Sequence, residues 1–93
     1  MARVDSAEFR FTATVHTTRR EVLYALRALS MAAQRTVSNK KPWSGVTDDL
    51  WAERHHHATF RFTSREYLNQ FHDWATEILK PGTWDWVGEG EDP

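Results

Sequence analysis

The chain has 93 residues, the length of one domain, and folding buries only about 60 to 65% of the unfolded surface at this size, so its stability should be modest. It contains no cysteine, which excludes a disulfide framework and a thiolate metal cluster. The net charge of −1 gives no general attraction to nucleic acid or membranes. The sequence lacks the uninterrupted apolar run that a signal peptide or a membrane span requires, so a soluble cytoplasmic protein is expected.

Residues 7–16 predict a half-buried strand that is followed by a helix. Apolar and polar side chains alternate here, and the apolar set shares one face: Phe9, Phe11, Ala13 and Val15. Residues 18–21, TRRE, have the form of a capping box, in which Thr18 accepts the amide of Glu21 and the Glu21 carboxylate reaches back. Apolar residues then recur every three or four positions, which predicts a helix up to about Gln34.

Residues 40–49, KKPWSGVTDD, indicate a loop or a short edge strand with a turn, because Pro42 and Gly45 interrupt any regular pattern. Over residues 50–63, most apolar residues fall on even positions and most polar residues on odd ones. This single parity predicts one long strand, or two pieces joined by a bulge. The stretch ERHHH contains no Gly, Pro, Asn or Asp, so no hairpin turn is expected inside it.

Residues 63–66, TSRE, predict a second capping box with Thr63 as the cap. The amphipathic pattern that follows is the strongest of the chain and predicts a second long helix. This helix should end at Lys80, because Pro81 disfavours a helical residue before it and Gly82 permits a chain reversal.

The two ends of the chain frame the predicted domain, which spans residues 7–87. Residues 83–87 alternate and predict a short last strand. Residues 88–93, GEGEDP, predict a disordered acidic tail, and residues 1–6 a flexible N-terminus.

The motif FRFT followed by a capping box occurs twice, at residues 9–21 and 60–66, which predicts a split β-α-β layout. With a weak strand near residues 42–47 and the short last strand, the predicted order is β-α-β-β-α-β. This is the ferredoxin-like α+β arrangement, one sheet with two helices packed on one face. We expect the first and third strands to be central parallel neighbours, so that the two FRFT segments lie side by side.

The histidine triplet at residues 55–57 raises the question of a metal or proton-transfer site. In the predicted strand, His56 points inward, while His55 and His57 point to the open face of the sheet. Neighbouring side chains on a strand diverge by about 180°, so the three rings cannot converge on one ion. His16 is expected far from them, and no metal-binding pattern such as H-E-x-x-H is present. A solvated strand face, without metal or cofactor, is therefore predicted.

The predicted binding residues belong to two groups. On the open face, the group comprises Arg10, Arg61, His55 and His57, with Trp51 as a residue on which a base could stack. In the loop, it comprises Lys40, Lys41 and Trp43. Charge is also divided unevenly, with a balance of +5 over residues 1–41 and −6 over residues 42–93. The division fits either a steering face for a charged partner or two helices with differently charged solvent sides.

Three classes of function fit these features. A small non-enzymatic module that binds another protein is favoured, because five tryptophans are difficult to bury in so short a chain and exposed Trp beside Arg is typical of interfaces. Such a module could be an accessory or inhibitor protein of a phage or mobile element, and could form a homodimer through an edge strand or the sheet face. One alternative is single-stranded nucleic-acid binding on the open face. The other is a small enzyme that uses His55 or His57 as acid or base.

Overall fold

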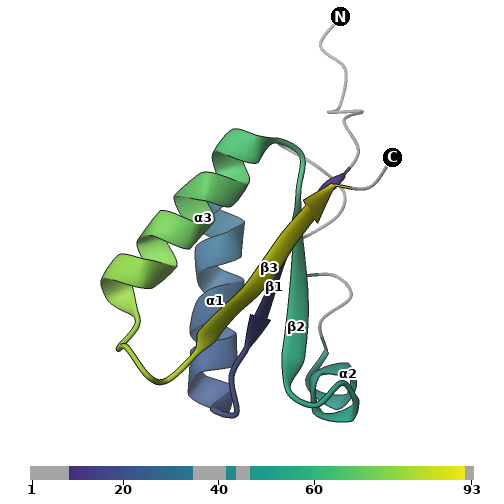
Figure 1. Ribbon diagram of the computed structural model, residues 1–93, viewed down its shortest axis with the longest axis vertical. Helices are drawn as coiled ribbons and strands as arrows, with labels where there is room; N and C mark the ends of the chain where they lie inside the picture. The colour runs from purple at the N-terminus through teal and green to yellow at the C-terminus, as the bar shows by residue number, and fades with distance from the viewer. Residues whose placement is uncertain (1–8, 35–41, 44–46, 92–93) are drawn as a thin grey trace, which may run out of the picture.

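The computed structural model describes residues 9–34, 42–43 and 47–91 (Figure 1). The elements in these ranges are, in chain order, β1 (Phe11–His16), α1 (Arg20–Ala33), α2 (Asp48–Glu53), β2 (His57–Phe62), α3 (Arg65–Ile78) and β3 (Asp85–Glu91). They form a small α+β domain with a three-stranded antiparallel sheet and three helices. None of these helices is long and apolar enough to cross a lipid bilayer.

β1 is the central strand of the sheet, and both neighbours run antiparallel to it in the order β2-β1-β3. Phe11 lies opposite Phe62, so the two FRFT segments are adjacent, as predicted. The parallel direction predicted for them is wrong. α1 ends near one end of the sheet, whereas α2, which directly precedes β2, lies near the other end (Figure 1). β2 therefore begins at the end of the sheet where β1 finishes, and it runs back antiparallel to β1.

The hydrophobic core lies between the sheet and the helices α1 and α3, which pack against each other on one side of it (Figure 1). The buried strand residues alternate with exposed or half-buried ones and are Ala13, Val15, Ala58, Phe60 and Phe62. The ring centroids of Phe60 and Phe62 each lie 5.1 Å from that of Phe71 on α3. The predicted orientation of these phenylalanines toward the helices is confirmed.

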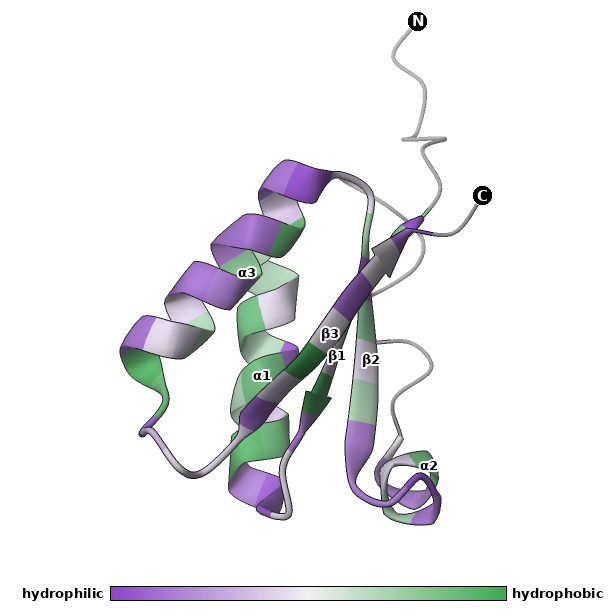
Figure 2. Ribbon diagram, in the orientation of Figure 1, coloured by the Kyte–Doolittle hydropathy of each residue, from purple (hydrophilic) through white to green (hydrophobic). Residues whose placement is uncertain are grey.

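The two long helices differ in polarity over their visible sides. Figure 2 shows mostly hydrophilic residues along the side of α3 in view, whereas α1 is largely hydrophobic beyond its first turn. Both helices bury an apolar stripe against the core, with Leu23 and Leu26 from α1 and Leu68 and Phe71 from α3 fully buried. This is the pattern expected for amphipathic helices that cover a sheet.

α1 begins close to the predicted position, but without the predicted capping box. Its N-cap is Arg19, which makes no side-chain capping hydrogen bond. The buried Thr17 hydroxyl instead accepts from the Arg19 amide at 3.2 Å and donates to the Thr83 carbonyl at 2.7 Å. Thr17 therefore joins the start of α1 to the segment before β3, and Thr18 stays exposed.

α3 begins one residue later than the predicted cap allows. Ser64 is the N-cap, and its hydroxyl accepts from the Tyr67 amide at 3.2 Å. Thr63 does not cap the helix, because its hydroxyl accepts a hydrogen bond from the side chain of Gln34. α3 stops at Ile78, two residues before the predicted end at Lys80, and Gly82 adopts a φ of 86° in the reversal that follows.

The long strand predicted over residues 50–63 is wrong in its first half, because residues 48–53 form the helix α2. Thr47 is its N-cap and accepts from the Leu50 amide at 3.1 Å, while Asp48 and Asp49 place negative charge in the first turn. A helix of six residues has fewer than two turns. Its few apolar positions therefore matched an alternating pattern by coincidence.

A tight reversal joins α2 to β2 where no turn was expected. His55 and His56 have φ values of 57° and 65°, in the left-handed region that glycine usually occupies. The amide of His56 donates to the carbonyl of Trp51 at 2.8 Å, which is the six-to-one bond of a Schellman motif. The helix end thus imposes the turn, although the sequence offers no residue that favours it.

β3 includes residues that were predicted to form a disordered tail. Residues 88–91 continue the strand and pair with β1, with a bulge in the ladder near Thr14 and Val15. Pro42 and Trp43, within the predicted weak strand, lie in a turn. The predicted flexible residues 1–6 lie outside the described part of the chain.

Candidate binding surface on the open sheet face

The face of the sheet turned away from α1 and α3, here called the open face, is polar. Its side chains come from the strand positions that alternate with the buried ones: Thr12, Thr14, His16, His57, Thr59 and Arg61. On β3, Asp85, Gly88 and Gly90 lie opposite residues of this set. Because both long helices lie on the other side (Figure 1), these residues share a face of the sheet that neither α1 nor α3 covers.

The centre of the open face is low in relief because it is made of threonines and glycines. Thr14 and Thr59 lie directly opposite each other, with their hydroxyl oxygens 3.1 Å apart. Gly90 lies opposite Thr12, and a β-carbon at Gly90 would be 3.0 Å from the Thr12 hydroxyl. A side chain at Gly90 would therefore crowd Thr12, whereas glycine leaves the surface flat.

One end of the open face carries two histidines and a carboxylate in a row across the three strands. His16 lies opposite His57 on β2 and opposite Asp85 on β3. The two ring centroids are 5.0 Å apart, and His16 Nδ1 is 3.8 Å from Asp85 Oδ2. The expectation that His16 lies far from the histidine triplet is therefore wrong, because it assumed parallel strands.

The arginines predicted for this surface lie near its other end. Arg10 pairs with Glu91 at 3.0 Å, and both side chains are about half exposed. Arg61 is exposed on β2, opposite Thr12 on β1. An exposed ion pair of this kind contributes about 0 to 1 kcal/mol, so the Arg10 contact is weak enough to exchange for a contact with a partner.

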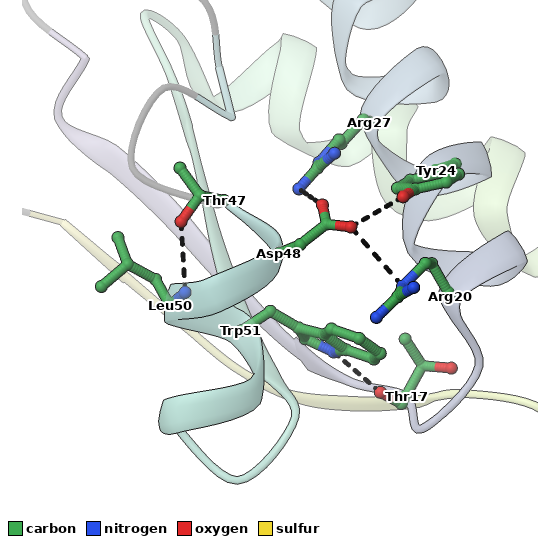
Figure 3. A network of polar contacts seen from close by, with 8 residues as sticks. All are labelled: Thr17, Arg20, Tyr24, Arg27, Thr47, Asp48, Leu50 and Trp51. Carbon is green, nitrogen blue, oxygen red and sulfur yellow. Dashed lines mark hydrogen bonds and ion pairs between the residues drawn. The ribbon is translucent and has the colours of Figure 1, made fainter.

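Two predicted members of the surface lie elsewhere. Trp51 is only 4% exposed, and its indole N–H donates to the Thr17 carbonyl at 2.9 Å (Figure 3), so it is unavailable as a stacking platform. His55 is exposed in the reversal before β2 and outside the sheet. His56, predicted to point inward, packs against Trp51 in a T-shaped arrangement with the two ring centroids 4.8 Å apart.

The predicted loop group is also not assembled into a site by the described residues. Trp43 is partly buried against the core, and the Arg27 guanidinium lies 5.2 Å from its ring centroid. Lys40 and Lys41 lie outside the described part of the chain. Trp43 therefore acts in packing as well as in any contact with a partner.

A polar network around Asp48 holds α2 against α1 (Figure 3). The Asp48 carboxylate accepts from the Tyr24 hydroxyl at 2.7 Å and from Arg27 at 2.9 Å, and Arg20 lies 3.5 Å away. The hydrogen bond from Tyr24 lowers the pKa of Asp48, with Arg27 adding to the effect, and the same bond raises the pKa of Tyr24. By fixing α2, this network fixes the point at which β2 begins.

Sequence reasoning placed Thr14, Thr59 and His16 on outward strand positions but missed which of them lie side by side. The Thr14–Thr59 pair and the relation of His16 to His57 and Asp85 depend on strand direction and register. An antiparallel pairing of the two FRFT segments would have placed His16 beside His57. No group of three or more His, Cys, Asp or Glu side chains that could hold a metal ion occurs within residues 9–34, 42–43 and 47–91.

Comparison of the chain with protein families, with curated proteins and with solved structures found no match. The open face is therefore interpreted from its own chemistry.

Proposed function

We propose that the chain is a small binding module that acts through contacts with another protein, and that the open face is its contact surface. The observation that carries the proposal is the polar centre of the open face, where the hydrogen-bonded Thr14–Thr59 pair lies beside two residues without side chains, Gly88 and Gly90. Small side chains let the surface of a partner approach the strands closely, and the hydroxyl groups both donate and accept hydrogen bonds.

The chemistry of the open face fits a polar, hydrated contact. The inward strand positions hold the aliphatic and aromatic side chains, while the outward positions hold threonine, histidine and arginine. Interfaces of this composition are typical of proteins that also exist separately, and bridging waters contribute to them. The exposed Arg61 adds the cationic residue that is enriched in such contacts.

The sheet also supports the finer ferredoxin-like description as a proposal. The amide of Arg61, on the outer edge of β2, donates to the carbonyl of Pro42 at 2.9 Å. The chain before α2 therefore meets the edge of β2 at this point. A ferredoxin-like sheet would place its additional strand beside that edge, and a hydrogen–deuterium exchange map of the β2 amides tests whether the edge is protected.

The two alternative functions have less support from the geometry. Nucleic-acid stacking was assigned to Trp51, which is buried. The acid–base alternative uses His55 or His57: His55 lies exposed in the reversal before β2, outside the sheet, and His57 Nδ1 lies 3.0 Å from the Arg54 carbonyl. Protein binding needs neither a stacking platform nor a histidine positioned against a reacting group, so it remains the proposal.

A matched pair of variants tests the proposal. Thr59→Arg places a long side chain at the centre of the open face, and Thr76→Arg makes the same change at an exposed position of α3. Affinity capture from nuclease-treated lysate of the native host should recover one protein with the wild type and with Thr76→Arg, but not with Thr59→Arg.

All three proteins should melt at similar temperatures, so that lost capture reflects lost contact. Capture of the same partner by Thr59→Arg would contradict the proposed surface. A parallel capture from untreated lysate that recovers nuclease-sensitive material, with no protein captured after nuclease treatment, would favour the nucleic-acid alternative.

A further inference from the structure

We propose that His16 and His57 together form a binding site for a divalent transition-metal ion of the zinc type. The two side chains project from directly opposed positions of β1 and β2 onto the same face, with ring centroids 5.0 Å apart. Imidazole nitrogen is a preferred ligand for zinc, nickel and copper. Adjacent rings on a rigid sheet place two such ligands beside one another without ordering a loop.

One ring nitrogen of His57 is oriented by a hydrogen bond, and the corresponding nitrogen of His16 faces a carboxylate. His57 Nδ1 lies 3.0 Å from the carbonyl of Arg54, and His16 Nδ1 lies 3.8 Å from the Asp85 carboxylate. Metal-binding histidines usually place the non-ligating N–H against a carbonyl or a carboxylate, which fixes the tautomer and makes the other nitrogen a better ligand. In this arrangement the Nε2 atoms are the ones left to bind the ion.

The charge around the pair favours a cation. Asp85, on the strand next to His16, is the one carboxylate in the row, and its side chain is 80% exposed. The next strand pair on this face is the uncharged Thr14–Thr59. Arg61 lies two outward positions beyond His57 on β2, with Thr59 between them. A dication over the histidines therefore meets a carboxylate on one side and hydroxyl groups on the other.

The pair supplies two ligands, whereas a zinc ion takes four or more. Since no cluster of three or more suitable side chains occurs among the described residues, the remaining positions would be taken by water or by donor groups of a bound molecule. The site is therefore open and its affinity modest. It does not depend on the proposed protein-binding function, because it is tested on the isolated chain.

The test is a titration of the full chain with zinc chloride. At each addition, the NMR chemical shifts of the five histidine rings are recorded. His16 and His57 should shift together, while His72, which stacks on Trp86 with centroids 3.9 Å apart, should stay unchanged. Magnesium chloride at the same concentrations is the control and should shift none of them, because magnesium prefers oxygen ligands.

Variants separate this site from binding at the exposed triplet. His16→Ala and His57→Ala should each lower zinc affinity at least tenfold, and His55→Ala should leave it unchanged. Asp85→Asn should weaken binding about 10- to 100-fold, the usual loss when the group that orients a ligand is changed. The melting temperature of each variant is measured without metal and should equal that of the wild type, so that a lower zinc affinity does not reflect unfolding.

Three results would overturn the inference. One is an absence of zinc-dependent shifts, and another is equal shifts at all five histidines. The third is binding that survives in His16→Ala but is lost in His55→Ala, which would place the ion on the triplet.

Discussion

The side chain of Gln34 forms two hydrogen bonds with Thr63. Its amide nitrogen donates to the Thr63 hydroxyl at 2.8 Å, and its carbonyl oxygen accepts from the Thr63 backbone amide at 3.1 Å. Gln34 is the C-cap of α1 and only 9% exposed, while Thr63 precedes the N-cap of α3. One side chain therefore joins the end of one long helix to the start of the other.

Replacing Gln34 with alanine should lower the free energy of unfolding by about 1 to 3 kcal/mol. The change removes both bonds and leaves the Thr63 amide without its partner in a half-buried position. Chemical denaturation measures the difference. Gln70→Ala on α3 is the matched control and should stay within about 0.5 kcal/mol of the wild type; an equal loss in both variants would contradict this role of Gln34.

His55→Gly should stabilise the protein. His55 has a φ of 57°, which costs a residue with a side chain about 1 to 2 kcal/mol that glycine does not incur. The greater freedom of glycine in the unfolded chain offsets part of the gain, so a net rise of about 0.5 to 1 kcal/mol is expected. Arg54→Gly, at a φ of −97°, should bring no gain. A lower melting temperature for His55→Gly than for the wild type would disprove this account of the turn.

The Asp48 contact should make stability depend on pH in the acid range. The pKa of Asp48 is held below its ordinary value of 3.8, so its contribution is complete above that pH and is lost as pH falls through the lowered pKa. The melting temperature of Asp48→Asn should therefore change less with pH, between about pH 2 and 5, than that of the wild type. An unchanged slope in Asp48→Asn would contradict this role of Asp48.

Tyr24, the hydrogen-bond partner of Asp48, should make stability fall at alkaline pH instead of acid pH. The pKa of Tyr24 is raised above 10.0, so the contribution of its hydroxyl is present below that pH and is lost as pH rises through the raised value. Tyr24→Phe should remove this alkaline loss, which ultraviolet titration of the tyrosines and melting temperatures together would detect. An unchanged alkaline limb would argue against the Tyr24–Asp48 bond.

Gly90→Ala should destabilise the protein more than Gly88→Ala. The new β-carbon at position 90 would lie 3.0 Å from the Thr12 hydroxyl, whereas no atom lies within 4 Å of one at position 88. We expect a loss of about 1 kcal/mol, at the lower end of the cost of overpacking, because the Thr12 side chain can rotate away. Adding Thr12→Ala to Gly90→Ala should recover most of it. Equal stability of the two single alanine variants would show that the close approach has no cost.

The sequence correctly predicted the elements in which a regular hydrophobic pattern extends over many residues. The alternation around Phe11 and Phe60 and the three-to-four spacing of the long helices depend on residues that all contact one core, so the sequence reveals them. α2 was missed because six residues are too few to separate a helical period from an alternating one. The turn at His55 was missed because the helix end, and no local residue preference, sets its backbone.

The candidate surface was only partly predicted, because a strand pattern shows which side of the sheet a residue faces but not which strand lies next to it. Alternation correctly placed Arg61 and His57 on the outward side of β2, but it contains no information on which strand lies beside them or in which direction. Alternation also put His16 on the outward side of β1, but only the register of β1 with its two neighbours places it beside His57 and Asp85. Trp51 is not part of the surface, because it lies on α2, a helix that was not predicted, and its side chain is buried in the core.

The central position of β1 has a consequence for how the chain acquires its structure during synthesis. Of the three described strands β1 is made first, yet the Arg10–Glu91 contact at its end joins residues 81 positions apart, and β3 pairs with one of its two edges. The ribosome must therefore extend the chain through residue 91 before the sheet can close. Until then the nascent β1 has an unsatisfied edge, and such long-range closure favours slow folding and dependence on chaperones.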